Sequence, residues 1–103
     1  MRDLSDIFNL LCEYNLCSNQ SDFSRDWLGR SNGYYAYLLS SGAEPNSASL
    51  GMLCARISNV LFQTVGKIDE SDRKRLLKAS VLAGIMMMRE RSYEVSKRRV
   101  HRD

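Results

Sequence analysis

The sequence of 103 residues predicts an all-α domain built from five helices. Apolar residues recur at spacings of three and four over most of the chain, which is the period of an amphipathic helix. Glycines and the single proline separate these stretches, at places where helices commonly end. The chain shows no alternating strand pattern, internal repeat or low-complexity tract. Its length suits one domain with a modest hydrophobic core.

The first helix is expected from about Leu4 to Asn15, with Asp3 or Ser5 available as its cap. Its apolar residues share one face: Leu4, Ile7, Phe8, Leu11 and Tyr14. A short second helix is expected to start at a cap near Ser21 and to end at Gly29. Phe23 and Trp27, four residues apart, would share its buried face.

The third helix is expected to start with Ser31 or Asn32 as its cap and to stop at Ser40-Ser41-Gly42. Leu38 and one of Tyr34 or Tyr35 should pack inward, which leaves the other tyrosine and Tyr37 exposed. Two short helices joined by a turn that contains glycine form a helix-turn-helix, here about Ser21–Ser40. In such a motif the second helix is placed to enter the major groove of DNA.

The fourth helix is expected after Asn46 or Ser47 as its cap and before a stop at Gly66, with Ile68 as the closing hydrophobic contact. Its apolar residues are Leu50, Leu53, Cys54, Ile57, Val60, Leu61 and Val65.

A fifth helix, capped by Asp69 or Ser71, could reach Val95. One stripe on it consists of Leu77, Val81, Gly84, Ile85 and Met88, and Leu76, Ala83 and Met87 widen it. So broad an apolar surface predicts a homodimer through Leu77, Val81, Ile85 and Met88. The alternative is that this helix folds back wholly onto the first and fourth. The predicted organisation is a helix-turn-helix core at 1–66, a dimerisation helix at 67–96 and a basic flexible tail at 97–103.

Composition excludes several classes of protein. With 44% hydrophobic and 26% charged residues the chain is typical of a globular protein, and no apolar run approaches the ~20 residues of a membrane span. The acidic N-terminus has no signal-peptide pattern, so a cytoplasmic protein is expected. Three cysteines and His101, without metal-ligand spacing, predict no metal site. No catalytic constellation, phosphate loop, cofactor motif or small-molecule site is evident, so an enzyme is not expected.

The positive charge lies mainly outside the helix-turn-helix. Residues 1–66 contain four basic and six acidic residues, a charge of −2. Because the whole chain has a net charge of +3, residues 67–103 carry +5. The first turn of the expected fifth helix contains Arg73-Lys74-Arg75. The helix dipole disfavours positive charge at this end, so the placement favours an outside partner for the cluster. A solvated helix face is the simpler interpretation of such a basic run.

The order of these signals resembles the Cro/C1-type family, also called XRE-like or lambda-repressor-like, over about Leu4–Val60. Gln20 opens the second helix, Gly29 lies between the short helices, and Gly42 precedes Pro45-Asn46-Ser47. The resemblance implies a five-helix DNA-binding core that binds operators as a dimer. The segment Phe23–Ser31, Phe-Ser-Arg-Asp-Trp-Leu-Gly-Arg-Ser, also resembles a motif of small uncharacterised bacterial proteins.

The resemblance assigns Gln20 to a phosphate or base contact and Ser31, Asn32 and Tyr34 to the turn and the start of the recognition helix. The same surface would take Arg25 and Arg30 as phosphate clamps, or else these arginines pair with Asp22 or Asp26. The predicted DNA-binding residues are Gln20, Arg25, Arg30, Ser31, Asn32, Tyr34, Tyr35 and Tyr37. The tyrosines could equally be core or interface aromatics.

Two departures from the family pattern concern spacing and one side chain. The intervals from Gln20 to Gly29 and from Gly29 to Gly42 are each one residue longer than usual, and Ser24 stands where alanine is common.

From the helix-turn-helix pattern and this resemblance we expect a small DNA-binding transcriptional regulator that contacts double-stranded DNA. The alternative is a protein-interaction module on a helix-turn-helix scaffold without DNA affinity.

Overall fold

The computed structural model describes the backbone of residues 3–102 and the side chains of residues 3–89. The elements in order are α1 (Leu4–Glu13), α2 (Gln20–Asp22), the π-helix η1 (Phe23–Trp27), α3 (Tyr34–Ser41), α4 (Ser47–Gln63) and α5 (Glu70–Arg102). α2 runs directly into η1, so the two form one short helix. The described chain contains five helices and no strands, which confirms the all-α prediction.

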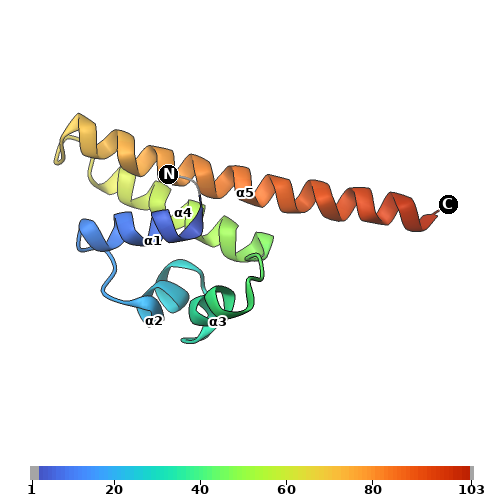
Figure 1. Ribbon diagram of the computed structural model, residues 1–103. Helices are drawn as coiled ribbons and strands as arrows, with labels where there is room; N and C mark the ends of the chain where they lie inside the picture. Colours follow the sequence, from blue (N-terminus) through green and yellow to red (C-terminus); the bar gives the residue numbers. More distant parts are fainter. Residues whose placement is uncertain (1–2, 103) are drawn as a thin grey trace.

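α4 and α5 form the most extensive helix pair and lie antiparallel along one side of the molecule (Figure 1). α1 packs across this pair, and α2, η1 and α3 lie on the side opposite α5. The second half of α5 extends past the other helices and accounts for the longest of the three extents, 54 × 26 × 20 Å. The helix-turn-helix and α5 therefore occupy opposite sides of the core.

α1 begins with a capping box. The Asp3 carboxylate accepts hydrogen bonds from the backbone N–H groups of Ser5 and Asp6, and the Asp6 side chain accepts one from the backbone of Asp3. These bonds satisfy donors that the first turn of a helix cannot satisfy itself. The helix ends at Glu13, two residues before the predicted end, because Asn15 adopts a left-handed conformation with φ of 59°.

The hydrophobic core is continuous across all the helices and follows the predicted periodicity. Its fully or nearly fully buried members include Ile7 and Leu11 of α1, Phe23 of η1, Leu53 and Ile57 of α4, and Ala79 and Ala83 of α5. Val65, expected on the same face of the fourth helix, is 60% exposed because α4 ends at Gln63 and Val65 lies in the following turn.

Small side chains and hydroxyls allow α4 and α5 to pack closely. A Cβ atom on Gly51 would lie 3.3 Å from the sulfur of Met87, tighter than most such contacts. Near the middle of the seam the Ser80 hydroxyl is 3.1 Å from the Ser58 hydroxyl and 3.5 Å from the Cys54 sulfur. Asn46 caps α4 as predicted, since its side chain accepts a hydrogen bond of 2.8 Å from the N–H of Ser49.

α5 is longer than predicted. Its helical backbone runs from Glu70 to Arg102, past the expected end near Val95, so residues 97–102 of the expected tail are helical. The last residue of that tail, 103, lies outside the described residues. No described helix is both long and apolar enough to cross a membrane.

Candidate functional site

Three aromatic rings fix the third helix to the core. The ring centroids of Phe8, Phe23 and Tyr35 lie 4.9–5.2 Å apart, within the range of favourable aromatic contacts. Tyr35 is only 2% exposed, so it holds α3 against α1 and η1. Its predicted role as a DNA contact is therefore wrong. Of the two neighbouring tyrosines, Tyr35 is the one that packs inward, and burial raises the pKa of its phenol.

A single hydroxyl joins the two helices of the motif. Gly33, the cap residue of α3, has no side chain that could cap the helix. Ser24 of η1 takes over this function: its hydroxyl accepts a 2.9 Å hydrogen bond from the N–H of Tyr35 and donates one of 2.9 Å to the carbonyl of Gln20. Ser24 is fully buried, so both bonds are shielded from water. The serine at this position thus acts as a cap from outside the helix that it stabilises.

The helix between Gln20 and Gly29 contains a π-turn. From Phe23 to Trp27 the helix widens, with the N–H of Leu28 bonded to the carbonyl of Phe23 at 3.0 Å. A π-turn takes one more residue than an α-helical turn over the same path. Gly29 then ends the helix in a left-handed conformation with φ of 66°, as the sequence predicted.

The second helix starts earlier, and the third later, than predicted. Asn19, not Ser21, caps α2: its side chain accepts a 2.8 Å hydrogen bond from the N–H of Asp22. α3 starts at Tyr34, so Ser31 and Asn32 lie in the turn before the helix instead of capping it.

Four of the eight predicted contact residues are exposed at the turn and on α3. The turn brings Arg30, Ser31 and Asn32 together beside the start of α3, all of them exposed. Tyr37 is 58% exposed on the next turn of the helix. Tyr34 is half-buried: its hydroxyl accepts a 3.3 Å hydrogen bond from the N–H of Asn46, and its ring lies 4.9 Å from the guanidinium carbon of Arg30.

Gln20 and Arg25 are also exposed, on the preceding helix. Arg25 forms an ion pair with Asp22, as the alternative interpretation predicted. Residues 19–46 contain two arginines and three acids, so the motif carries a net charge of −1. Of its two cations, Arg25 faces a carboxylate and Arg30 faces an aromatic ring.

The basic cluster at the start of α5 has partners within the chain. Arg73 donates a 2.9 Å hydrogen bond to the carbonyl of Leu61, near the end of α4, and Lys74 lies 3.8 Å from Glu70. Arg75 forms an ion pair with Glu13 of α1, and this hydrogen bond raises the pKa of its guanidinium. These contacts within the chain account for the position of the basic cluster, so no outside partner is needed to explain it.

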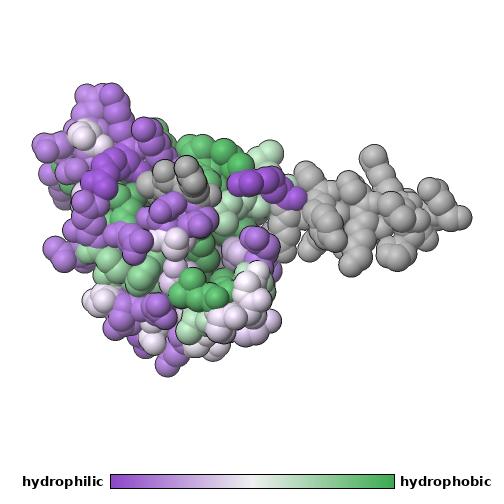
Figure 2. Space-filling model, viewed as in Figure 1, coloured by the Kyte–Doolittle hydropathy of each residue, from purple (hydrophilic) through white to green (hydrophobic). Residues whose placement is uncertain are grey.

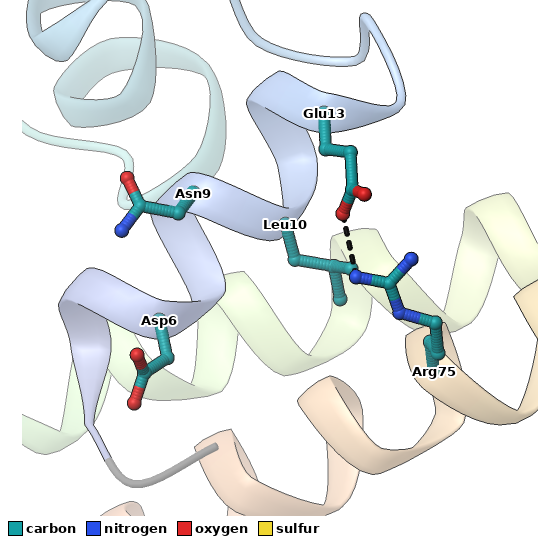
Figure 3. Close-up of a pocket in the computed structure, with 5 residues that line it drawn as sticks. All are labelled: Asp6, Asn9, Leu10, Glu13 and Arg75. Carbon is teal, nitrogen blue, oxygen red and sulfur yellow. Dashed lines mark hydrogen bonds and ion pairs between the residues drawn. The ribbon is translucent and has the colours of Figure 1, made fainter.

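Arg75 also borders a groove between α1 and α5 (Figure 3). The open groove has a volume of about 410 Å³ and is lined by Asp6, Asn9, Leu10, Glu13 and Arg75. Beside it the Tyr14 hydroxyl donates a 2.9 Å hydrogen bond to Asp72 and accepts one of 3.0 Å from Arg75. The charged groups are therefore engaged with each other, and they connect α1 to α5. Sequence reasoning missed this network because its members lie about 60 residues apart.

The cysteines belong to the core and its edges. Cys17 is buried, and burial raises the pKa of its thiol to about 11, which keeps the thiol neutral near pH 7. Cys12 and Cys54 are half-buried, and all three are free thiols. Within the described residues no three His, Cys, Asp or Glu side chains are grouped as metal ligands.

The sequence matches the family of unknown function DUF6626 over residues 4–98, nearly the whole chain. The chain belongs to this family. No curated protein and no solved structure matches it. The match extends across the helix-turn-helix, α4 and most of α5, so the family comprises the whole arrangement and not the motif alone.

Proposed function

We propose that this member of DUF6626 is a DNA-binding protein of the kind that regulates transcription. The proposal rests on one observation: two short helices are joined by a glycine-containing turn whose exposed residues are polar. Arg30, Ser31 and Asn32 stand together at the start of α3, where a recognition helix meets base edges. The resemblance of the motif to Cro/C1-type proteins supports the same function.

Each exposed group has a chemical role in this proposal. Asn32 can donate to and accept from the edge of adenine, which presents an acceptor and a donor in the major groove. Arg30 and Gln20 can bond phosphate oxygens on either side of the groove. Tyr37 can contact a thymine methyl group with its ring or a phosphate with its hydroxyl. The buried Tyr35 keeps α3 in place for these contacts.

The charge of the motif determines how strongly it can bind. With only Arg25 and Arg30 as cations, the motif can neutralise few phosphates. The logarithm of the affinity changes by about −0.9 per neutralised phosphate for each tenfold rise in salt, so two contacts give a slope of about −2. Non-specific affinity is therefore low, and hydrogen bonds to bases contribute most of the discrimination.

Fluorescence anisotropy of the full chain with a pool of random duplexes, at two salt concentrations, tests the proposal. Binding with a shallow salt slope supports it, and selection from the pool then gives the preferred sequence. Arg30→Ala should weaken binding on every sequence and lower the slope by about one. Asn32→Ala should change preference at one base pair by about 1–3 kcal/mol. Lys67→Ala, which removes a charge from the exposed α4–α5 turn, is the control.

A protein-interaction module is the second candidate, and the composition of α3 favours it. No residue of α3 is charged, and its exposed side chains include Tyr37 and Leu39, at 58% and 53% exposure. Aromatic residues are enriched and charged ones depleted at the centres of protein interfaces. If the chain binds no DNA even at low salt, DNA binding is excluded, and Tyr37→Ala becomes the variant with which to search for a protein partner.

A further inference from the structure

The middle of α5 is apolar on two opposite faces. From Leu76 to Met88 its only charged residue is Lys78. One face, with Leu76, Ala79 and Ala83 all at most 3% exposed, packs against the rest of the chain. A helix that is hydrophobic all round is normally covered all round. Among the residues whose side chains are described, only one face of this helix is covered.

The uncovered face forms what we call the apolar strip. It consists of Leu77, Val81, Ile85 and Met88 on α5 with Phe62 on α4, at exposures of 52%, 53%, 46%, 65% and 80%. Phe62 follows Ser58 by one helical turn, and the Ser58 hydroxyl bonds Ser80 of α5, so Phe62 lies on the side of α4 next to α5. Figure 2 shows hydrophobic side chains gathered over the middle of α5.

We propose that the apolar strip binds a second copy of the chain, with the two α5 helices antiparallel about a two-fold axis between Val81 and Ile85. The area suits this occupant. If a large apolar side chain presents on the order of 150 Å² when fully exposed, the strip offers roughly 450 Å². A standard interface takes about 800 Å² from each partner, somewhat more than half of it apolar.

Spacing and charge determine the direction of the two helices. The α5 residues of the strip follow one another at intervals of four, four and three, as at the seam of two packed helices. Lys74 and Lys78 lie beside the strip toward its N-terminal end. Parallel helices would place four lysines together at one end and two Arg89 side chains at the other. Antiparallel helices place one lysine pair beside one Arg89 at each end, which distributes the positive charge more evenly. Leu77 of one copy then faces Met88 of the other.

Sedimentation equilibrium of the full chain over a micromolar range, with light scattering as a second measure of mass, tests this inference. The expected result is a dimer. Val81→Glu places two unpaired carboxylates in the symmetric interface, so the dissociation constant should rise at least about 100-fold while helicity by circular dichroism is unchanged. Leu39→Glu is the matched control, because Leu39 is also 53% exposed but lies on α3. It should leave the dimer intact.

Three outcomes would overturn the proposal. A monomer at every concentration would show that a second copy does not cover the strip. A dimer that Val81→Glu leaves unchanged would place the interface elsewhere. A dimer that Lys74→Ala strengthens severalfold would show parallel helices, since only that arrangement brings the lysines together. None of these readouts involves DNA, so failure here and failure of the proposed function are separate results.

Discussion

The helix-turn-helix and the α4–α5 pair bury their inner faces in the same core, but their outer faces differ. The exposed surface of the turn is polar, with Arg30, Ser31 and Asn32, whereas the exposed face of α5 carries Leu77 and Val81 at about half exposure. The motif is held by an aromatic cluster and hydrogen bonds through Ser24, and the α4–α5 pair by small residues and apolar contacts. One chain thus presents two surfaces of different chemistry.

Phenylalanine substitutions in the two regions should show the largest contrast. Phe23→Ala removes a fully buried ring that contacts Phe8 and Tyr35, and should lower the free energy of unfolding by about 3–5 kcal/mol. Phe62→Ala removes a ring that is 80% exposed, and should change the stability of the monomer by less than about 0.5 kcal/mol. Urea unfolding at low protein concentration measures both. Equal losses would contradict the separation of inner and outer faces.

Ser24→Ala tests whether one hydroxyl holds the motif together. The substitution leaves the buried N–H of Tyr35 without its acceptor, and should cost about 1–3 kcal/mol. The substitution should accelerate hydrogen exchange more at the amide of Tyr35 than at the amides of α4. Ser40→Ala, at an exposed position on α3, is the control and should have little effect. Unchanged exchange at Tyr35 would exclude the cap.

Two glycines of the motif offer a finer comparison. Gly29→Ala puts a Cβ atom into a left-handed conformation, 3.3 Å from the end of Met52, and should cost about 1–2 kcal/mol. Gly33→Ala meets no atom within 4 Å and has a negative φ, so its effect should be close to zero. Thermal unfolding of the two variants measures both losses of stability. A loss for Gly33→Ala as large as for Gly29→Ala would argue against backbone strain as the cause.

A further expected effect is a dependence of stability on alkaline pH through Cys17. Burial raises the pKa of its thiol from 9.0 to about 11, so the folded state favours the neutral thiol more than the unfolded state does. Its contribution to stability is complete below pH 9 and is lost as the pH rises toward 11. Unfolding at several alkaline pH values, compared with Cys17→Ala, should show a shallower decline in the variant. Identical slopes would contradict this.

Local signals made much of the fold predictable. Helical periodicity, Asn46 as a cap, and the stops at Gly29 and Gly42 act within a few residues of the chain, and all are present in the structure. No local signal indicated the π-turn within Phe23–Trp27. A π-turn and a longer loop satisfy the same spacing from Gln20 to Gly29.

The candidate site was less predictable because it depends on contacts between distant segments. Tyr34 and Tyr35 are equally suited to burial, and only the positions of Phe8 and Phe23 select Tyr35. The partners of Arg75 lie on α1, about 60 residues away, so no spacing rule could link them.

The π-turn has a consequence for length variation among relatives. Because η1 holds one residue more than a regular turn would need, a relative that lacks one residue between Phe23 and Trp27 can replace the wide turn by an ordinary α-helical one. The flanking Asn19 cap and the left-handed Gly29 would then keep their places. We expect natural members of the family to tolerate a single-residue deletion here, and to tolerate it poorly within α3, where every residue belongs to a regular helical turn.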